Sequence, residues 1–429
     1  DEMLRERGSR LVIRRGDSLE ILKALIREHQ VTHLFWNRLY EPAVIERDKR
    51  LKQTLTEAGL ACESFNGSLL YEPWEIQTGQ KTPYKVFTAF WKACLKRGLP
   101  QADPQAAPDE LPALPGSVAT EDLDVLQLLP STPWDSGFSE TWTPGSTSAL
   151  TQLDTFIANS IEHYNSDRDL PGTIGTSRLS PHIHFGELSP LQVLNSVRAM
   201  TEFDATMRPS GENVYIKQLG WRDFGHHLMY HFPQTTQRPL DERFNDYPWL
   251  SQDDAGELLR AWQQGRTGFP IVDAGMRELW HTGWMHNRVR MIVASLLTKN
   301  LGIHWLEGAR WFWDTLVDAD LANNSMGWQW TAGCGADAAP FFSHLQPRQP
   351  ERALRSAGSL YPQVGARTGE TAGQGTPCPL DAKSRTPQPC RHPPWRRLPL
   401  SCCRSQRDAR TCTRAVESGQ ISVLRGSVR

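Results

Sequence analysis

The strongest indication of chemistry in this sequence is a group of polar residues around position 290. Asn287, Arg290 and Met291 lie three and four residues apart after Gly283, so a helix that begins there would place them on one face. A guanidinium in an apolar helix interface needs polar partners, because an unpaired buried charge costs roughly several kcal/mol. The segment therefore predicts a buried ion pair, a polar ligand, or both.

A second stripe of the same kind follows in the sequence. Asp320, Asn324 and Trp328 recur every fourth residue, and Asp318 stands just before them. Arg290 and Asp318 would satisfy each other as an ion pair, which leaves the other polar residues of both stripes in need of hydrogen-bond partners. A flat ligand rich in heteroatoms, bound between the two helices, would supply these partners.

Tryptophan is concentrated in the same region, where ten of the chain's 16 tryptophans lie between Trp221 and Trp330. Tryptophans at helical spacing usually fill a hydrophobic core, and that interpretation is favoured for any single one of them. The charged residues beside them are harder to explain by packing. From the residues themselves, a core and a binding site both stay open.

Residues 176–181 form a turn of small hydroxyl side chains, with the sequence Thr-Ser-Arg-Leu-Ser-Pro. Hydroxyls and free backbone amides donate hydrogen bonds without bulk, which suits phosphate oxygens. Such a run is also typical of a helix cap, so phosphate binding is one of two interpretations. His182 and His184 follow, but no further cluster of ligands accompanies them, and we predict no metal site.

Residues 212–232 predict a long helix. Tyr215, Gln218, Trp221 and Arg222 lie three or four residues apart and share one face of it. An aromatic platform beside a guanidinium and an amide suits a nucleic-acid base that has been taken out of a duplex.

Several long motifs together resemble the photolyase/cryptochrome family, and within it the bacterial type of cyclobutane-pyrimidine-dimer photolyase. The resemblance covers roughly residues 9–342, and the motifs occur in the family's order. These motifs are Trp221 to Phe224, Trp262 to Gly268, Pro270 to Arg277, Trp284 to Arg290, and Asp318 to Asn324.

The resemblance implies that the chain binds FAD. It implies that Asn324 contacts the reactive nitrogen of the flavin and stabilises its reduced form, while the Arg290–Asp318 pair lies over the ring edge. The residues that it assigns to the cofactor are Tyr164, Thr176, Ser177, Arg178, Leu179, Ser180, Arg222, Asn287, Arg290, Asp318, Asp320 and Asn324.

The resemblance also implies light-driven repair of pyrimidine dimers in DNA, in which excited reduced FAD gives one electron to the dimer and later recovers it. Gln218 stands where many members have Glu, so we expect dimer binding to persist with some loss of rate. The residues assigned to the dimer are Tyr215, Gln218, Trp221, Asn287, Met291 and Trp330, and those assigned to DNA phosphates are Arg168 and Arg288. The family also has a relay of tryptophans that carries electrons from solvent to the oxidised flavin. The residues that match this relay are Trp262, Trp305 and Trp328.

The first part of the chain predicts strands at residues 10–14, 31–36 and 60–65, with helices at 19–29 and 43–58 between them. This order indicates a parallel sheet, hence a partial Rossmann-like domain. The family's antenna domain has five strands, and its first strand lies at the centre of the sheet. Because two strands are missing here, we expect the chain to start inside a longer product and its folate or deazaflavin antenna site to be incomplete. A smaller three-stranded unit is the alternative.

The predicted fold class is α/β plus all-α, in four parts. The parts are an α/β antenna-type domain at 1–98, a linker at 99–149, a helical FAD-binding and DNA-binding domain at 150–342, and a disordered tail at 343–429. The first helix of the helical domain is expected to run from Leu150 to Tyr164.

The tail differs in composition from the rest of the chain. It holds five of the eight cysteines and carries 15 Lys/Arg against five Asp/Glu, which leaves the remaining body at a net charge of −11. Its cysteines lack the spacing of a zinc site. Residues 343–355 can be encoded by bases that, read one position later, spell the family's Arg-Ile-Phe-Asn-Pro continuation, so we infer a shifted reading frame after Phe342. Because the body of the chain is acidic, DNA binding must come from a local group of basic residues at the rim of the binding cleft.

Neither an apolar run of about 18 residues nor an apolar leader is present, so we expect a cytoplasmic monomer that does not cross a membrane. Three functions stay open: a light-driven DNA repair lyase, a cryptochrome-like blue-light sensor with the same flavin, and an inactive photolyase fragment. Trp330 beside Asn324 and Met291 favours repair, because a pure sensor does not need a dimer pocket.

Overall fold

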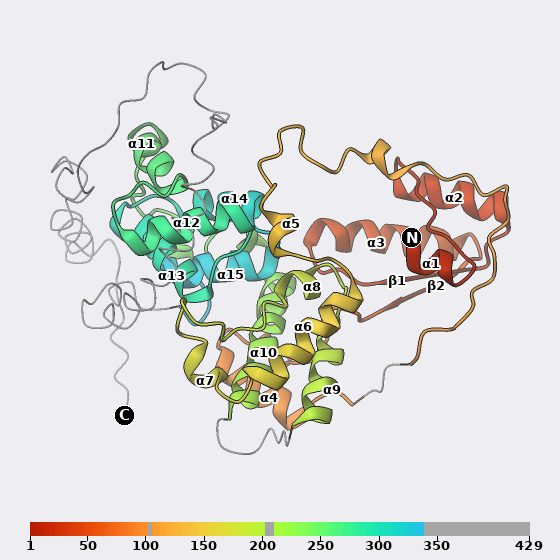
Figure 1. The fold of residues 1–429 in the computed structure, drawn as a ribbon, viewed down its shortest axis with the longest axis horizontal. Coiled ribbons are helices and arrows are strands. Elements are labelled where there is room, and N and C mark those ends of the chain that lie inside the picture. Colours follow the sequence, from red (N-terminus) through yellow and green to blue (C-terminus); the bar gives the residue numbers. More distant parts are fainter. Residues whose placement is uncertain (102–104, 202–209, 339–429) are drawn as a thin grey trace.

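The computed structural model of the protein describes residues 1–101, 105–201 and 210–338. Within these ranges the chain is mostly helical, with one small sheet at one end of the molecule (Figure 1). The first part comprises α1 (Glu2–Glu6), α2 (Ser18–His29), β1 (His33–Asn37), α3 (Pro42–Glu57), β2 (Ala61–Phe65), α4 (Phe87–Arg97), η1 (Leu123–Leu126) and α5 (Phe138–Thr141). The helical region comprises α6 (Ser146–Asn159), α7 (Tyr164–Asp167), α8 (Ser180–His184), α9 (Pro190–Met200), α10 (Gly211–His231), η2 (Pro233–Thr236), η3 (Glu242–Phe244), α11 (Gln252–Gln263), α12 (Pro270–Thr282), α13 (Asn287–Ser295), η4 (Leu296–Asn300), α14 (Trp305–Thr315) and α15 (Leu321–Ala332).

β1 and β2 form a parallel pair joined by α3, in a register that aligns His33 with Ala61. Both strands and the helices α2 and α3 agree with the sequence prediction to within a few residues. α2 begins where the carboxylate of Asp17 accepts hydrogen bonds from the backbone amides of Leu19 and Glu20 (3.0 and 3.2 Å).

The strand predicted at residues 10–14 is absent, and that prediction is wrong. The backbone amide of Ile13 donates to the hydroxyl of Thr120 (2.9 Å), and its carbonyl accepts from the amide of Glu121 (2.9 Å). These bonds place the segment beside the linker instead of beside β1, so the sheet of the described chain has two strands. The apolar run predicts an extended segment correctly but does not specify its partner.

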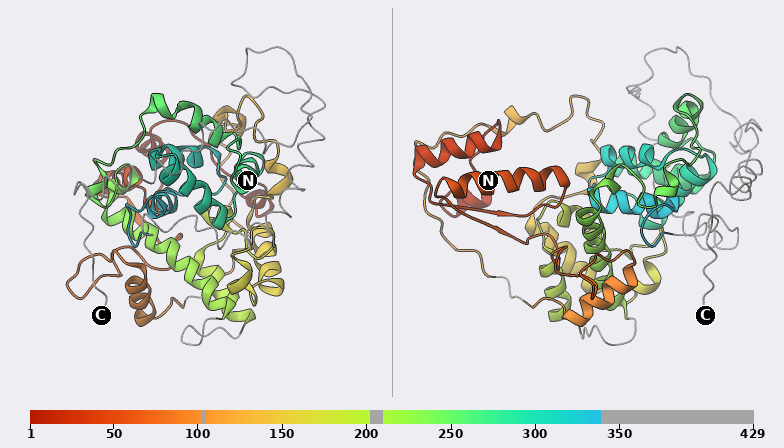
Figure 2. Two further views of the ribbon diagram at one scale, coloured as in Figure 1. Left: turned by 90° about the vertical axis from the view of Figure 1, so that its left-hand side faces the viewer. Right: turned by 180° about the vertical axis from the view of Figure 1, so that it is seen from behind.

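α10 is the central helix of the helical region, and α4, α7, α9 and α15 pack around it (Figures 1 and 2). Ser210 caps its N-terminus by accepting a hydrogen bond from the amide of Asn213 (3.2 Å). The predicted helix at residues 212–232 is confirmed to within one residue at each end.

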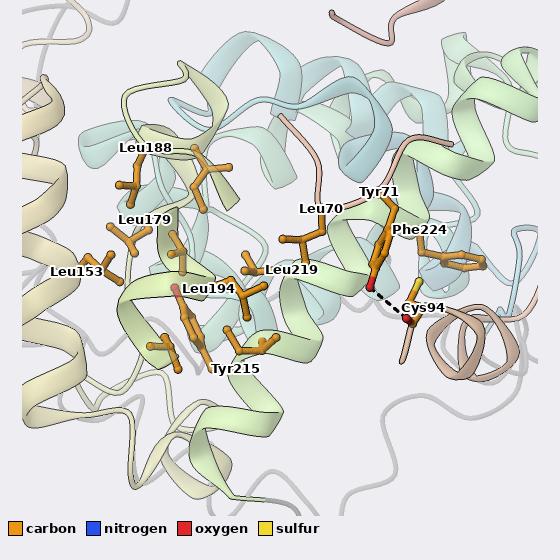
Figure 3. Close-up of a cluster of buried hydrophobic side chains, with 14 of the residues drawn as sticks. Leu70, Tyr71, Cys94, Leu153, Leu179, Leu188, Leu194, Tyr215, Leu219 and Phe224 are labelled. Carbon is orange, nitrogen blue, oxygen red and sulfur yellow. Dashed lines mark hydrogen bonds between the residues drawn. The ribbon is translucent and has the colours of Figure 1, made fainter. Parts of the chain in front are cut away.

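α4 packs with the helical region although it precedes the linker. Phe87 and Cys94 are buried, and the ring of Phe87 lies 5.7 Å from that of Phe224 on α10. Figure 3 shows Tyr71 beside Cys94, with the tyrosine hydroxyl donating to the carbonyl of Cys94 (3.0 Å). The core of the helical region therefore includes residues from before position 98, where the domain boundary is predicted.

The helix expected to run from Leu150 to Tyr164 is interrupted. α6 ends at Asn159, and Tyr164 begins the separate short helix α7. The carbonyl of Phe156 accepts from the amides of both Ser160 and the next residue, which closes the last turn of α6.

The linker crosses from the α/β region to the surface of the helical region. The indole nitrogen of Trp142 donates to the carbonyl of Thr282 on α12 (2.6 Å). Gly137 approaches the backbone of His281 so closely that a side chain would collide with it. The linker therefore packs against α12.

Helices α11 to α15 enclose a second core, in which Trp262, Trp305 and Trp328 are at most 2% exposed. Gly308 of α14 permits this packing, because a Cβ there would lie 2.0 Å from the ring of Trp328. Of the described helices, none is long and apolar enough to span a membrane. The predicted tail and the inferred frame shift after Phe342 lie outside the described residues.

Candidate functional site

The ion pair predicted between Arg290 and Asp318 is confirmed. Nη2 of Arg290 donates to both carboxylate oxygens of Asp318 (3.0 and 2.8 Å), and its Nε donates to the carbonyl of Met285 (2.7 Å). Gly283 ends α12 in the left-handed region (φ 66°), and α13 begins at Asn287 after the turn. The pair thus joins the start of α13 to the loop ahead of α15.

Asp320 caps the start of α15 with a side chain that is 12% exposed, and it lies close to two basic side chains. Its Oδ1 accepts a hydrogen bond from the amide of Asn323 (2.8 Å). Its Oδ2 lies 3.3 Å from Nε2 of His226 and 3.9 Å from Nη2 of Arg222, both on α10. Burial acts to raise the pKa of Asp320, but His226 and Arg222 outweigh it and hold the pKa far below its usual value. Asp320 is therefore a carboxylate at neutral pH.

The inference that Asp320 and Asn324 need a ligand as their hydrogen-bond partner is wrong. Nδ2 of Asn324 donates to the carbonyl of Ala309 on α14 (2.8 Å), and Asp320 has the partners given above. Asn287 is exposed at the first turn of α13, where water can satisfy it. The partners come from α10 and α14, which the spacing within α15 cannot reveal.

Two buried polar side chains that the sequence did not single out lie near the ion pair. Glu278 is 7% exposed and His286 is 2% exposed, and within the described chain Oε2 of Glu278 and Nε2 of His286 have no hydrogen-bond partner. Burial raises the pKa of Glu278 to about 7, although Arg178 and Arg290 act to lower it. Burial and the neighbouring arginines lower the pKa of His286 to about 4. Buried atoms without partners are costly, so a ligand that bonds to them would be favoured here.

The turn predicted to bind phosphate lies beside these groups. The guanidinium of Arg178 is 4.6 Å from the ring centre of Trp284, and the side chain is exposed. Arg178 adopts a positive φ of 52°, a conformation uncommon outside glycine. The hydroxyl of Ser177 forms a hydrogen bond with Tyr215, and Leu179 is buried, so both residues anchor the turn to the core.

The remaining residues of the predicted cofactor segment differ in exposure. Thr176 is half-buried, and Ser180 is exposed at the start of α8. Tyr164 is buried in the core, with the guanidinium of Arg168 5.4 Å from its ring centre. His182, in the neighbouring motif, forms a hydrogen bond through Nδ1 to the carboxylate of Glu187 (2.5 Å).

The aromatic wall predicted on α10 is not assembled as expected. Tyr215 is 4% exposed among the aromatic rings of α6 and α7. Trp221 lies flat against Phe87 of α4, with ring centroids 3.6 Å apart. Gln218 donates to the backbone carbonyl one turn earlier (2.8 Å), while Arg222 reaches Asp320 and the carbonyl of Ser68. Because α4, α6 and α7 pack against this helix, these side chains contact different neighbours and form no open aromatic platform within the described chain.

The two arginines predicted to contact DNA phosphates meet at one carboxylate. Arg288 donates through Nε and Nη2 to Oδ1 of Asp169 (2.8 and 2.7 Å), and Nε of Arg168 lies 3.6 Å from the same oxygen. Nη1 of Arg288 approaches the sulfur of Met291 (3.5 Å). Trp330, also assigned to the dimer, is half-buried on α15.

Comparisons with known proteins identify the family of the chain. The family described as "DNA photolyase" matches residues 1–113, and "FAD binding domain of DNA photolyase" matches residues 215–360. A deoxyribodipyrimidine photo-lyase from Agrobacterium fabrum is 44% identical over 345 residues, which cover 80% of this chain and 71% of that protein. The chain belongs to the photolyase/cryptochrome family.

Both branches of the photolyase/cryptochrome family are represented among its relatives. Cryptochrome-1 from Arabidopsis thaliana is 36% identical over 348 residues, covering 80% of this chain and 50% of that protein. The crystal structure of a class III photolyase from Agrobacterium tumefaciens superposes with a TM-score of 0.77 at 41% identity, over 85% of this chain and 74% of that one.

The tryptophans matched to the family's relay lie deep in the second core. Trp262 is 0% exposed, and its ring lies 6.0 Å from that of Trp328. Trp305 is buried beside His304 (ring centroids 5.6 Å), and His304 lies 5.1 Å from Trp249, which is half-buried. Trp249 was not predicted, because no motif surrounds it, and of these tryptophans it is the one with access to solvent.

The residues present fit the FAD that this family binds. The hydroxyl turn at residues 176–180, with exposed Arg178, suits a diphosphate. Oε2 of Glu278 and Nε2 of His286 are buried polar atoms that a ligand rich in hydroxyls and ring nitrogens can satisfy. A small cavity of about 20 Å³, lined by residues such as Gly225, Ala322 and Gln329, lies along α15, and none of these groups lines it.

Proposed function

We propose that this chain binds FAD and uses blue light to repair cyclobutane pyrimidine dimers in DNA. One observation carries the proposal: Arg178, Glu278, His286 and the Arg290–Asp318 pair come together from four segments, and within the described chain Oε2 of Glu278 and Nε2 of His286 are buried without a hydrogen-bond partner. The similar protein from Agrobacterium fabrum is named for this repair reaction.

The turn at residues 176–180 is assigned to the diphosphate of FAD. Arg178 supplies a guanidinium next to Trp284, and Thr176, Ser177 and Ser180 supply hydroxyls. Leu179 and Tyr164 are both buried in the core of the helical region, and Leu179 fixes the turn to this core.

The flavin ring is assigned to the two polar stripes. Arg290 is locked by Asp318, Asn324 is oriented by the carbonyl of Ala309, and Asp320 is kept ionised by charges on α10. Such fixed groups orient a ring without reorganisation during the reaction. Asn287, which is exposed at the N-terminal end of α13, is also assigned to the flavin ring.

When bound, FAD would supply a light-excited donor of one electron for splitting the dimer. The chain's part is to hold the dimer and the DNA. Met291 and Trp330 are assigned to the dimer side, and Arg168 and Arg288 to the phosphates. Tyr215, which is buried, and Trp221, which is half-buried against Phe87, are assigned to supporting the dimer side, and Gln218, which cannot transfer a proton, is expected to slow the reaction.

For reduction of the cofactor from solvent, we assign Trp328 and Trp305 to the inner positions. The outer position is better filled by Trp249 than by Trp262, because the outermost donor must meet solvent and Trp262 is wholly buried. Trp249→Phe should slow photoreduction strongly, while Trp262→Phe should alter it less. If both variants slow photoreduction equally, Trp262 would again be assigned to the relay, as the sequence predicts.

The experiment that tests the proposal uses the purified chain, reduced anaerobically with FAD, and an oligonucleotide with a single thymine dimer. Blue light should restore the thymines, and darkness should not. Arg178→Ala should lose FAD, whereas Lys217→Ala, on the exposed side of α10, should keep it. A chain that holds FAD and binds DNA but repairs no dimers under light contradicts the proposal.

A cryptochrome-like sensor is the second candidate function. The likeness to cryptochrome-1 and the flat packing of Trp221 on Phe87 support it, since a sensor needs no open dimer wall. Photoreduction of the flavin without repair would favour the sensor, and failure to retain FAD would favour an inactive fragment. We also propose that the two-stranded sheet holds no folate or deazaflavin antenna and that the chain acts as a monomer.

A further inference from the structure

Arg168 and Arg288, which are assigned to DNA phosphates, both approach the carboxylate of Asp169. Arg288 turns both Nε and Nη2 to Oδ1 of Asp169, a side-on arrangement that is also used to bind phosphate. Arg168 approaches the same oxygen at 3.6 Å. One carboxylate oxygen therefore takes the place that a DNA phosphate oxygen would occupy.

All three side chains are reachable from solvent. The side-chain exposures are 48% for Asp169, 37% for Arg288 and 19% for Arg168. An ion pair this exposed is weak, so a phosphate can displace the carboxylate. While Asp169 stays in place, however, the three side chains together carry a charge of one instead of two.

We propose that Asp169 is an internal substitute for DNA phosphate that competes for Arg168 and Arg288 and so limits the affinity of the chain for DNA. The inference rests on the proposed DNA-binding role of these arginines. The loop after α7 supplies the competing carboxylate, and α13 supplies the arginine that it holds. Residues 1–342 together carry a net charge of −11, so each cation that is freed among these side chains has a large effect on DNA binding.

The test is Asp169→Asn, which removes the charge and keeps the shape. We expect the variant to bind both undamaged and dimer-containing duplex roughly three- to tenfold more tightly at low salt, with a salt dependence steeper by about one phosphate equivalent. Asp167→Asn is the matched control, because it removes the same charge two residues away, where Asp167 accepts from the hydroxyl of Ser166 (2.8 Å). The control should leave the salt dependence unchanged.

Weaker binding by Asp169→Asn, or an unchanged salt slope, would overturn the inference and make Asp169 a support that positions the arginines. Asp169→Ser, which also lacks the charge, decides the matter if the first variant does not fold. Wild-type chain that binds no DNA at low salt would contradict the proposed function itself. The two failures are therefore distinct.

Discussion

The α/β region and the region of α11 to α15 differ most in how completely their side chains are buried. α2 has no buried residue, and Phe35 and Phe65 on the two strands are 56% and 49% exposed. In the second core, by contrast, Trp262 and Trp305 are at most 1% exposed. A parallel sheet is normally covered on both faces, and this one is not within the described chain. The Arg290–Asp318 pair, Asp320 and Asn324, which are assigned to the flavin ring, lie on or beside α13 and α15 in the packed region.

The α/β region contacts α10, the central helix of the helical region, through a short segment after β2. The amides of Leu70 and Tyr71 donate to Oδ2 of buried Asp223 on α10 (2.9 and 3.0 Å), and Arg222 donates to the carbonyl of Ser68. The α/β region is therefore held by backbone contacts to α10, next to residues of the candidate site. The following predictions test how far the two regions differ.

The largest effect is expected for Asp318→Ala. The variant leaves the guanidinium of Arg290 without its partner in a largely buried position, which should lower the free energy of unfolding by about 3 kcal/mol and abolish FAD retention. Urea denaturation and a desalting assay measure the two effects. Glu20→Ala, which breaks the exposed pair with Lys23 on α2, should cost less than about 1 kcal/mol. Similar losses in both variants would remove the contrast between the regions.

Glu278→Gln should change the pH dependence of stability in the FAD-free chain. Because burial raises the pKa of Glu278 from its ordinary value of 4.5 to about 7, its favourable contribution is complete below pH 4.5 and is lost as the pH rises through 7. Relative to wild type, the variant should gain up to about 3 kcal/mol in unfolding free energy between pH 4.5 and 8. Urea titrations across this range test it, with exposed Glu257→Gln as the control. Parallel stability curves for Glu278→Gln and wild type would show that the carboxyl is not desolvated.

Gly308→Ala should disturb the second core. Its new Cβ would lie 2.0 Å from the ring of Trp328, and overpacking of this kind costs about 1–3 kcal/mol. Gly327→Ala on α15 is the matched control, since a Cβ there has no atom within 4 Å and alanine favours the helix by up to about 1 kcal/mol. Thermal melting of both variants should move in opposite directions, and a neutral Gly308→Ala would mean that Trp328 is loosely held.

The smallest effect is expected for Phe35→Ser in β1. With the side chain already 56% exposed, the free energy of unfolding should change by no more than about 0.5 kcal/mol, while solubility improves. Denaturation and concentration-dependent light scattering measure both. A loss above about 1 kcal/mol would show that this face of the sheet is covered in solution.

Features that depend on neighbouring residues could be predicted from the sequence. Gly283 ends a helix, Asp17 caps one, and the long helix at 212–232 is found where its spacing places it. The pairing of Arg290 with Asp318 was predictable as well, because each residue needs an opposite charge and the other supplies it.

Features that depend on distant segments could not be predicted. Residues 10–14 pair with the linker, and Asn324 finds its acceptor on α14, so neither contact has a local signature. Glu278 looks like an ordinary surface charge in the sequence, and only packing shows it to be buried. Trp249 has no motif around it, and its place beside His304 comes from the fold.

The central claim is that the Arg178 turn and the two polar stripes hold one FAD. The most direct measurement is the visible absorption spectrum of the purified chain after incubation with FAD and desalting. The account predicts flavin absorption at one FAD per chain, which Asp318→Ala loses and Gly327→Ala retains. A chain with the helical circular dichroism of the native fold that emerges colourless would contradict it.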